Sequence, residues 1–213
     1  MAKPELVIFD CDGILVDSEV ISNQILVDNL GRYGLTVSLD ECMGLFVGGS
    51  MTGVEAKAKE LGAVLPKGWI DEIYTETYAR LKQGVAPVAG VVAVLDHLDS
   101  VGVAYCVASN GSAAKMQITL GQNGMLDRFQ GRIYSAHELG VSKPDPDLFL
   151  IAAGDVSAEN CVVIEDSLSG VKAARAAGMK CFGYIEHGDG VALAAESAIL
   201  FDDMTKLPGL LGV

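Results

Sequence analysis

Two aspartates stand one residue apart, directly after a short apolar run near the start of the chain. The run Leu6–Phe9 is followed by Asp10-Cys11-Asp12, and Gly13 then lets the chain turn. Because side chains i and i+2 of an extended segment point the same way, both carboxylates are expected to share one small volume. Two anions held so close repel each other unless a cation or a proton relieves them. The pair therefore predicts a metal site or an acid/base pair.

Polar side chains also follow three later apolar runs, at points where strands of a sheet would end. Each group alone is a weak signal, because two nearby acids occur often by chance and a Ser-Asn pair after a strand is usually a helix cap. Together, in this order and each behind its own strand, they point to one site. The groups are Ser109-Asn110-Gly111, Lys143-Pro144-Asp145 and Glu165-Asp166-Ser167.

The elements that must position these groups alternate regularly in the later part of the chain. Strand-like apolar runs are separated by segments whose apolar residues have helical spacing. This alternation predicts a parallel, doubly wound α/β sheet, in which ligands bind outside the carboxyl ends of the strands. We expect strands at 6–9, 103–107, 132–135, 161–164 and 180–185, and helices at 91–98, 113–123, 146–153 and 169–177.

Residues 17–83 interrupt this alternation. Helical spacing recurs at 17–33, 51–61 and 69–81, and no strand-like run lies between these segments. We therefore expect a small all-helical domain at 17–83, inserted into a core formed by residues 1–16 and 84–213. Gly48-Gly49-Ser50 is predicted to be a loop of this insert that faces the site, because glycine permits close backbone approach.

The composition excludes several classes of partner. The chain has 213 residues, half of them hydrophobic, and a net charge of −13 without a Lys/Arg cluster. Nucleic acid and anionic membranes are therefore not expected partners, and no apolar stretch approaches the length of a membrane span. The five cysteines have no paired spacing, and we see no leader. We expect a cytoplasmic protein, as a monomer or a weak dimer.

The residue types at the predicted sheet edge suit phosphoryl transfer, which depends mainly on positioning and charge neutralisation. A carboxylate such as Asp10 can attack phosphorus to give an aspartyl phosphate. A second carboxylate, Asp12, can protonate the leaving oxygen and later deprotonate water. Mg²⁺ prefers hard oxygen ligands, which Asp10 and Asp166 can provide. Lys143 offers a point charge to phosphate oxygens, and Ser109 offers a hydrogen bond.

These motifs resemble those of the haloacid dehalogenase (HAD) superfamily, over nearly the whole chain. The motifs that carry the resemblance are Asp10-Cys11-Asp12-Gly13, Ser109-Asn110, Lys143-Pro144 and Glu165-Asp166-Ser167. The run from Ser169 to Met179 is typical of the branch that contains sugar phosphatases and phosphomutases. The resemblance implies an HAD-like Rossmannoid core and a mobile helical cap at 17–83, which closes over the site and reads the substrate.

The resemblance also implies roles for individual residues. Asp10 would be the nucleophile and Asp12 the general acid/base, with phosphate bound by Ser109, Asn110 and Lys143. Mg²⁺ would be held by Asp10, by the backbone carbonyl of Asp12 and by Asp166, with Glu165 either a ligand or a group behind the ligands. Two residues of the first cap helix, Glu19 and Asn23, could contact the substrate or could form a solvated face of that helix.

Departures from the superfamily's patterns narrow the expected activity. The dehalogenases lack the second aspartate, so Asp12 favours phosphate chemistry. Hexose phosphomutases of this branch carry a histidine and a cap arginine at places that fall here on Ser22 and roughly on Met51. We therefore expect a phosphatase of a small sugar phosphate or of a sugar-acid phosphate such as 6-phosphogluconate. A β-phosphoglucomutase-like activity is the alternative, and a non-enzymatic phospho-acceptor module is a third reading.

Overall fold

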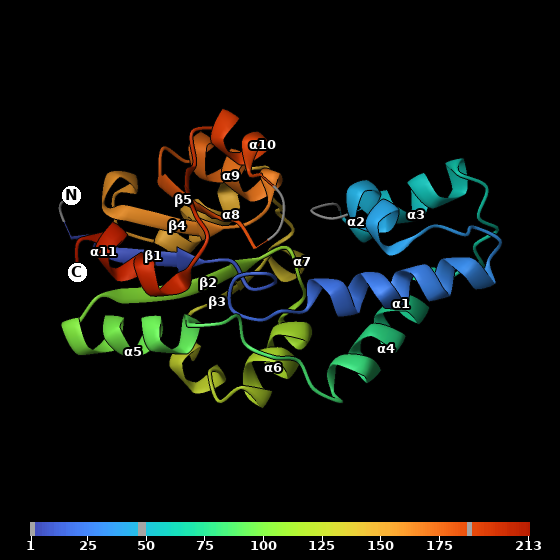
Figure 1. Cartoon of the computed structure of the whole chain (residues 1–213), viewed down its shortest axis with the longest axis horizontal. Helices are drawn as coiled ribbons and strands as arrows, with labels where there is room; N and C mark the ends of the chain where they lie inside the picture. The colour runs from blue at the N-terminus through green and yellow to red at the C-terminus, as the bar shows by residue number, and fades with distance from the viewer. Residues whose placement is uncertain (1–2, 47–49, 187–188) are drawn as a thin grey trace.

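A computed structural model describes residues 3–46, 50–186 and 189–213 (Figure 1). Its centre is a six-stranded parallel sheet in the order β3-β2-β1-β4-β5-β6. The first strand in the sequence, β1, lies in the middle of the sheet between β2 and β4, as in doubly wound folds. The strands are β1 (Leu6–Phe9), β2 (Ala104–Ser109), β3 (Ile133–Ser135), β4 (Cys161–Glu165), β5 (Lys180–Tyr184) and β6 (Ile199–Phe201).

Alternate residues of each strand feed two separate hydrophobic clusters, one on each face of the sheet. Val7 and Phe9 of β1 point into one cluster, whereas Leu6 and Ile8 point into the other. Helices cover both faces, so the strands are apolar on both sides. The helices of the core are α5 (Val91–Val101), α6 (Ala113–Gln122), α7 (Ala136–Leu139), α8 (Asp147–Ala153), α9 (Leu168–Ala176), α10 (Val191–Ala195) and α11 (Leu207–Leu211). Short 3₁₀ turns lie at Leu126–Phe129, Ala158–Asn160 and Met204–Lys206.

Helices α1 to α4 lie to one side of the sheet and pack around a third hydrophobic cluster of their own (Figure 1). Trp69 is fully buried in this cluster, and its indole N–H donates to Oδ1 of Asn29 at 2.6 Å. The segments that lead into and out of these four helices lie side by side, as the hydrogen bond from the N–H of Asp17 to the carbonyl of Ala86 shows. The four helices are α1 (Glu19–Arg32), α2 (Leu39–Phe46), α3 (Met51–Glu60) and α4 (Trp69–Leu81).

The α/β fold and parallel sheet are confirmed, with differences in detail. Strand β2 runs on to Ser109 and β4 to Glu165, so these two polar residues end their strands and do not follow them. The sequence prediction also missed α2 and the edge strand β6, which has only three residues. The predicted loop residues Gly48 and Gly49 lie outside the described ranges. Within those ranges, no helix is long and apolar enough to cross a membrane.

Candidate active site

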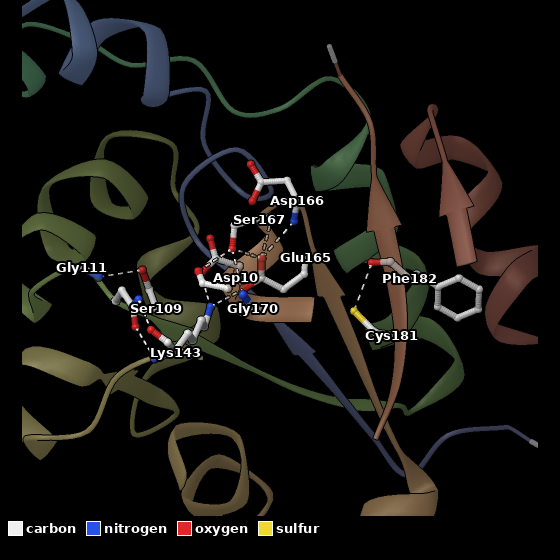
Figure 2. Close-up of polar contacts among 12 residues, drawn as sticks. Asp10, Ser109, Gly111, Lys143, Glu165, Asp166, Ser167, Gly170, Cys181 and Phe182 are labelled. Atoms are coloured by element: carbon white, nitrogen blue, oxygen red, sulfur yellow. Dashed lines mark hydrogen bonds and ion pairs between the residues drawn. The ribbon is translucent and has the colours of Figure 1, made fainter. Parts of the chain in front are cut away.

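Asp10 and Lys143 form the buried centre of the site, at the carboxyl edge of the central strands (Figure 2). Asp10 directly follows β1, and its N–H continues the sheet by donating to the carbonyl of Ile164. The Lys143 ammonium donates to Oδ1 of Asp10 and to Oε1 of Glu165, at 2.5 Å in each case. Lys143 thus bridges carboxylates from two neighbouring strand ends that lie 155 positions apart in the sequence, at Asp10 and Glu165.

The loop that carries Lys143 is held in place by Asn110. The Lys143 N–H donates to Oδ1 of Asn110 at 2.9 Å, and the Asn110 amide donates to the Lys143 carbonyl at 3.3 Å. Ser109 is buried beside it, and its hydroxyl accepts from the N–H of Gly111. Ser109 and Asn110 both line a cavity that lies over this edge of the sheet. The contacts give Asn110 a part in placing Lys143, and its direct contact with phosphate stays a prediction.

Three carboxylates lie close enough to share a cation. One oxygen from each of Asp10, Glu165 and Asp166 lies within 4.8 Å of the others. Glu165 is already well bonded, since its Oε2 accepts from the backbone N–H groups of Asp166 and Ser167 and from the Ser167 hydroxyl. Among the described residues, by contrast, no group donates a hydrogen bond to the Asp166 carboxylate. The donor set therefore fits a hard divalent cation, with Asp10 and Asp166 offering the open oxygens.

Burial disfavours the charged forms of the acids in this cluster. Burial raises the pKa of Asp10 to about 7, although Lys143 acts in the opposite direction. Burial, with the nearby charge of Glu165, raises the pKa of Asp166 well above its ordinary value. Burial alone would lower the pKa of the Lys143 ammonium, but Asp10 and Glu165 raise it. The single positive charge of Lys143 thus balances only part of the negative charge of the three carboxylates. A bound cation would balance the rest.

Asp12 has a different environment from Asp10. Its Oδ1 accepts from the hydroxyl of Ser18 and pairs with the ammonium of Lys115 at 2.8 Å. Burial alone would raise the pKa of Asp12, but the Lys115 charge and these hydrogen bonds lower it. The two aspartates of the opening motif therefore contact different cations, Lys143 for Asp10 and Lys115 for Asp12. Sequence reasoning did not find Lys115, whose position on α6 comes close to Asp12 only in the folded chain.

The carboxylates of Glu165 and Asp166 pack directly against the backbone of two glycines, where a side chain would have no room. A Cβ at Gly170 would lie 1.8 Å from Oε1 of Glu165, and a Cβ at Gly13 would lie 2.0 Å from Oδ2 of Asp166. Gly13 also has a φ of +75°, which other residues rarely adopt. The two glycines therefore allow the carboxylates of the cluster to lie directly on backbone.

We expect Gly13→Ala to displace the Asp166 carboxylate and to weaken divalent-cation binding by roughly 10–100-fold, as for other changes behind metal ligands. The left-handed backbone adds a stability loss of about 1–2 kcal/mol. Gly102→Ala is the matched control, because Gly102 has a φ of +64° but nothing within 4 Å of its Cβ position. Titration calorimetry with Mg²⁺ separates the two effects, and equal cation affinity in both variants would contradict the prediction.

A cavity of about 460 Å³ lies over these groups, between the core and helices α1 to α4. Glu19, Ser22 and Asn23 of α1 all line it. The Asn23 amide is engaged within the helical lobe, because it donates to the carbonyl of Glu19 and accepts from the thiol of Cys42. The Ser22 hydroxyl is buried and has no partner among the described residues. Met51 also lines the cavity. Ser22 and Met51 stand at the places of the phosphomutase histidine and arginine, and neither of them is basic.

This arrangement is that of an enzyme that handles phosphate at the carboxyl edge of a parallel sheet. Residues 7–184 match the model of the haloacid dehalogenase-like hydrolases, and the chain belongs to this family. The family predicted from the four motifs is thereby confirmed.

Individual relatives agree with this assignment. The chain is 31% identical to the 6-phosphogluconate phosphatase of Escherichia coli K12, over 99% of its own length and 96% of that protein. A haloacid dehalogenase-like protein from Agrobacterium tumefaciens has a TM-score of 0.86 and 32% identity, covering 98% of this chain and 97% of that chain. A HAD family hydrolase from Deinococcus radiodurans, solved with bound phosphate and sodium, has a TM-score of 0.81 and 31% identity, covering 100% and 96%. The chain is thus an HAD-like phosphatase, a phosphoric monoester hydrolase that acts on small phosphorylated metabolites.

Proposed function

We propose that this chain is a Mg²⁺-dependent phosphatase of a sugar phosphate or a sugar-acid phosphate such as 6-phosphogluconate, acting through an aspartyl phosphate on Asp10. The observation that carries the proposal is the buried contact of Asp10 with Lys143, beside an acid cluster that fits a cation. Lys143 keeps one oxygen of the nucleophile in place and its charge lies where phosphate oxygens would arrive. The likeness to a 6-phosphogluconate phosphatase supports the substrate class.

In the first step, a carboxylate oxygen of Asp10 attacks phosphorus and the bond from phosphorus to the ester oxygen breaks. Asp12, in its protonated form, gives its proton to that leaving oxygen, so that the product departs as an alcohol. In the second step, Asp12 takes a proton from water, whose oxygen attacks the phosphoryl group. The bond to Asp10 then breaks, inorganic phosphate leaves, and Asp12 is protonated again. Ser109 and Lys143 bind phosphate oxygens in both steps.

The residues that would hold Mg²⁺ are Asp10, Asp166 and the backbone carbonyl of Asp12, with Glu165 behind them. When bound, the ion neutralises phosphate charge that Lys143 alone does not balance. The hydrogen bonds of Glu165 to Lys143, Ser167 and the Asp166 N–H suit a group that orients the ligands.

We further propose that residues 17–83 act as a cap over the core formed by 1–16 and 84–213. The separate hydrophobic cluster of α1 to α4 supports a unit that can move as a body. Glu19 and Asn23 line the cavity from this side and are the proposed substrate contacts. The enzyme is assigned to the cytoplasm, a reducing compartment that suits its five buried free cysteines.

A phosphate-release screen tests this function. We expect the protein to release inorganic phosphate from sugar phosphates or sugar-acid phosphates in the presence of Mg²⁺. Activity should fall to background in excess chelator and should return when Mg²⁺ is added back, because the cluster of Asp10, Glu165 and Asp166 then regains its counter-ion. Nucleotides serve as the comparison substrates.

Two outcomes would contradict the proposal. Equal phosphate release with and without chelator would exclude the metal-dependent mechanism. Conversion of a sugar phosphate to its isomer without phosphate release, with a sugar bisphosphate as activator, would favour the phosphomutase alternative instead.

A further inference from the structure

Lys115 contacts the proposed acid/base, yet neither the motifs nor the roles above assign it a function. Its ammonium lies 2.8 Å from Oδ1 of Asp12, and its side chain is largely buried in the cavity wall. Ser18 donates to the same oxygen. Among the described residues nothing donates to Oδ2, which lies on the side of Gly111 and Ser109. One oxygen of Asp12 is therefore anchored, and the other is free.

The base of the Lys115 side chain is itself fixed, at the first turn of α6. The N–H of Lys115 donates to the hydroxyl of Ser112, the residue that caps this helix. That hydroxyl also lies 2.6 Å from the phenol oxygen of Tyr78, on α4 of the proposed cap. A continuous set of contacts thus runs from the helical lobe through the start of α6 to Asp12.

An acid that protonates a leaving group must present its proton within hydrogen-bond reach of that atom. A carboxylate on a short side chain can rotate, and each incorrect orientation removes it from reach. A cation that holds Oδ1 restricts this rotation and directs Oδ2 to one place. Lys115 can do this without touching the substrate's phosphate, which lies with Lys143 and Asp10 on the proposed mechanism.

We infer that Lys115 is a positioning residue for Asp12: it anchors Oδ1, so that Oδ2 exchanges the proton with the leaving oxygen. This inference rests on the proposed function, in which Asp12 is the acid. It requires that removing Lys115 harms protonation of the leaving group more than any other step. The effect must therefore depend on how much the leaving group needs a proton.

The test measures kcat/KM for phosphate esters with different leaving groups. The leaving group of an alkyl phosphate, such as a sugar phosphate that the enzyme accepts, is a strongly basic alkoxide that needs the proton. The leaving group of an aryl phosphate such as p-nitrophenyl phosphate is a weakly basic phenolate that hardly needs the proton. General acid catalysis contributes about 10²–10⁴-fold, so we expect Lys115→Met to lower kcat/KM at least tenfold more for the alkyl ester than for the aryl ester.

Three further variants make the result decisive. Asp12→Asn should also lose more kcat/KM for the alkyl ester than for the aryl ester, and by a larger factor than Lys115→Met, because the acid itself is then removed. Lys115→Arg retains the positive charge and should restore part of the loss; it also keeps the test valid if Lys115→Met folds poorly. Lys206→Met is the matched control, because Lys206 also pairs with an aspartate, Asp202, but at the exposed surface. It should leave both substrates unaffected.

Two results would overturn the inference. An equal loss for both esters in Lys115→Met would indicate general damage to the site. A loss confined to KM, with the same size for both esters, would make Lys115 a substrate-binding residue. If Asp12→Asn depends on the leaving group and Lys115→Met does not, only the role of Lys115 is wrong. If Asp12→Asn shows no such dependence, the proposed role of Asp12 fails as well.

Discussion

The Asp10→Asn variant is expected to release no inorganic phosphate from any ester that the wild-type protein hydrolyses. The amide has nearly the shape of the carboxylate, but its oxygen is a poor nucleophile and cannot form the aspartyl phosphate. Removal of a covalent nucleophile lowers kcat by several orders of magnitude, and we expect a loss of at least about 10⁴-fold. Phosphate release under saturating substrate and Mg²⁺ measures it.

The intermediate gives this prediction a second measurement. Rapidly quenched wild-type protein should carry one phosphoryl group on the peptide that contains Asp10, and Asp10→Asn should carry none. Asp127→Asn is the control, since Asp127 lies exposed at a distant 3₁₀ turn. Turnover by Asp10→Asn comparable to that of the wild type would end the proposed mechanism. Loss of activity in both variants would show that the substitution acts through the fold.

The prediction of the fold from sequence was strong where a segment is buried on both sides. Residues 6–9 and 161–164 are continuous apolar runs because helices cover both faces of the sheet, and such runs are distinctive. Short or exposed elements gave no such signal. The edge strand β6 has three residues, of which only Phe201 is buried, so its pattern cannot be separated from that of a loop.

The site was predictable as a set of residues but not as a set of contacts. The rule that polar groups gather at the carboxyl ends of parallel strands brings Asp10, Ser109, Glu165 and Asp166 together. It does not show that the Glu165 carboxylate accepts several hydrogen bonds while the Asp166 carboxylate accepts none from the residues that the structure describes, because that depends on the turn into α9. Neither does it show Lys115, which belongs to helix α6 and contacts Asp12 within the wall of the cavity.

The same contacts suggest why Asp10 and Asp12 can differ in role. Asp10 shares Lys143 with Glu165 and lies beside Asp166, so it sits where a cation and a phosphate would both be attracted. The Asp12 carboxylate instead contacts Ser18 and Lys115. Two adjacent carboxylates that meet different partners are the usual means by which one site provides both a nucleophile and an acid.

The Lys143→Met variant is expected to lose both activity and stability, and to respond more strongly to divalent cations. Removing one partner of a buried ion pair costs about 3–5 kcal/mol, because the remaining charges are left without compensation. Here two carboxylates, Asp10 and Glu165, lose their shared partner. The phosphate also loses a positive contact, which lowers kcat/KM by roughly 10²–10³-fold, as when one donor to a developing anion is removed.

The response to Mg²⁺ separates this explanation from a simple loss of packing. With Lys143 absent, the acid cluster attracts a cation more strongly, so Mg²⁺ should raise the melting temperature of Lys143→Met more than that of the wild type. Lys143→Arg retains the charge and should resemble the wild type in this response, although its planar head group places phosphate less well. Equal Mg²⁺-induced shifts in all three proteins would mean that Lys143 and the cation do not compensate the same carboxylates. In that case the acid cluster around Asp10 would not be the metal site.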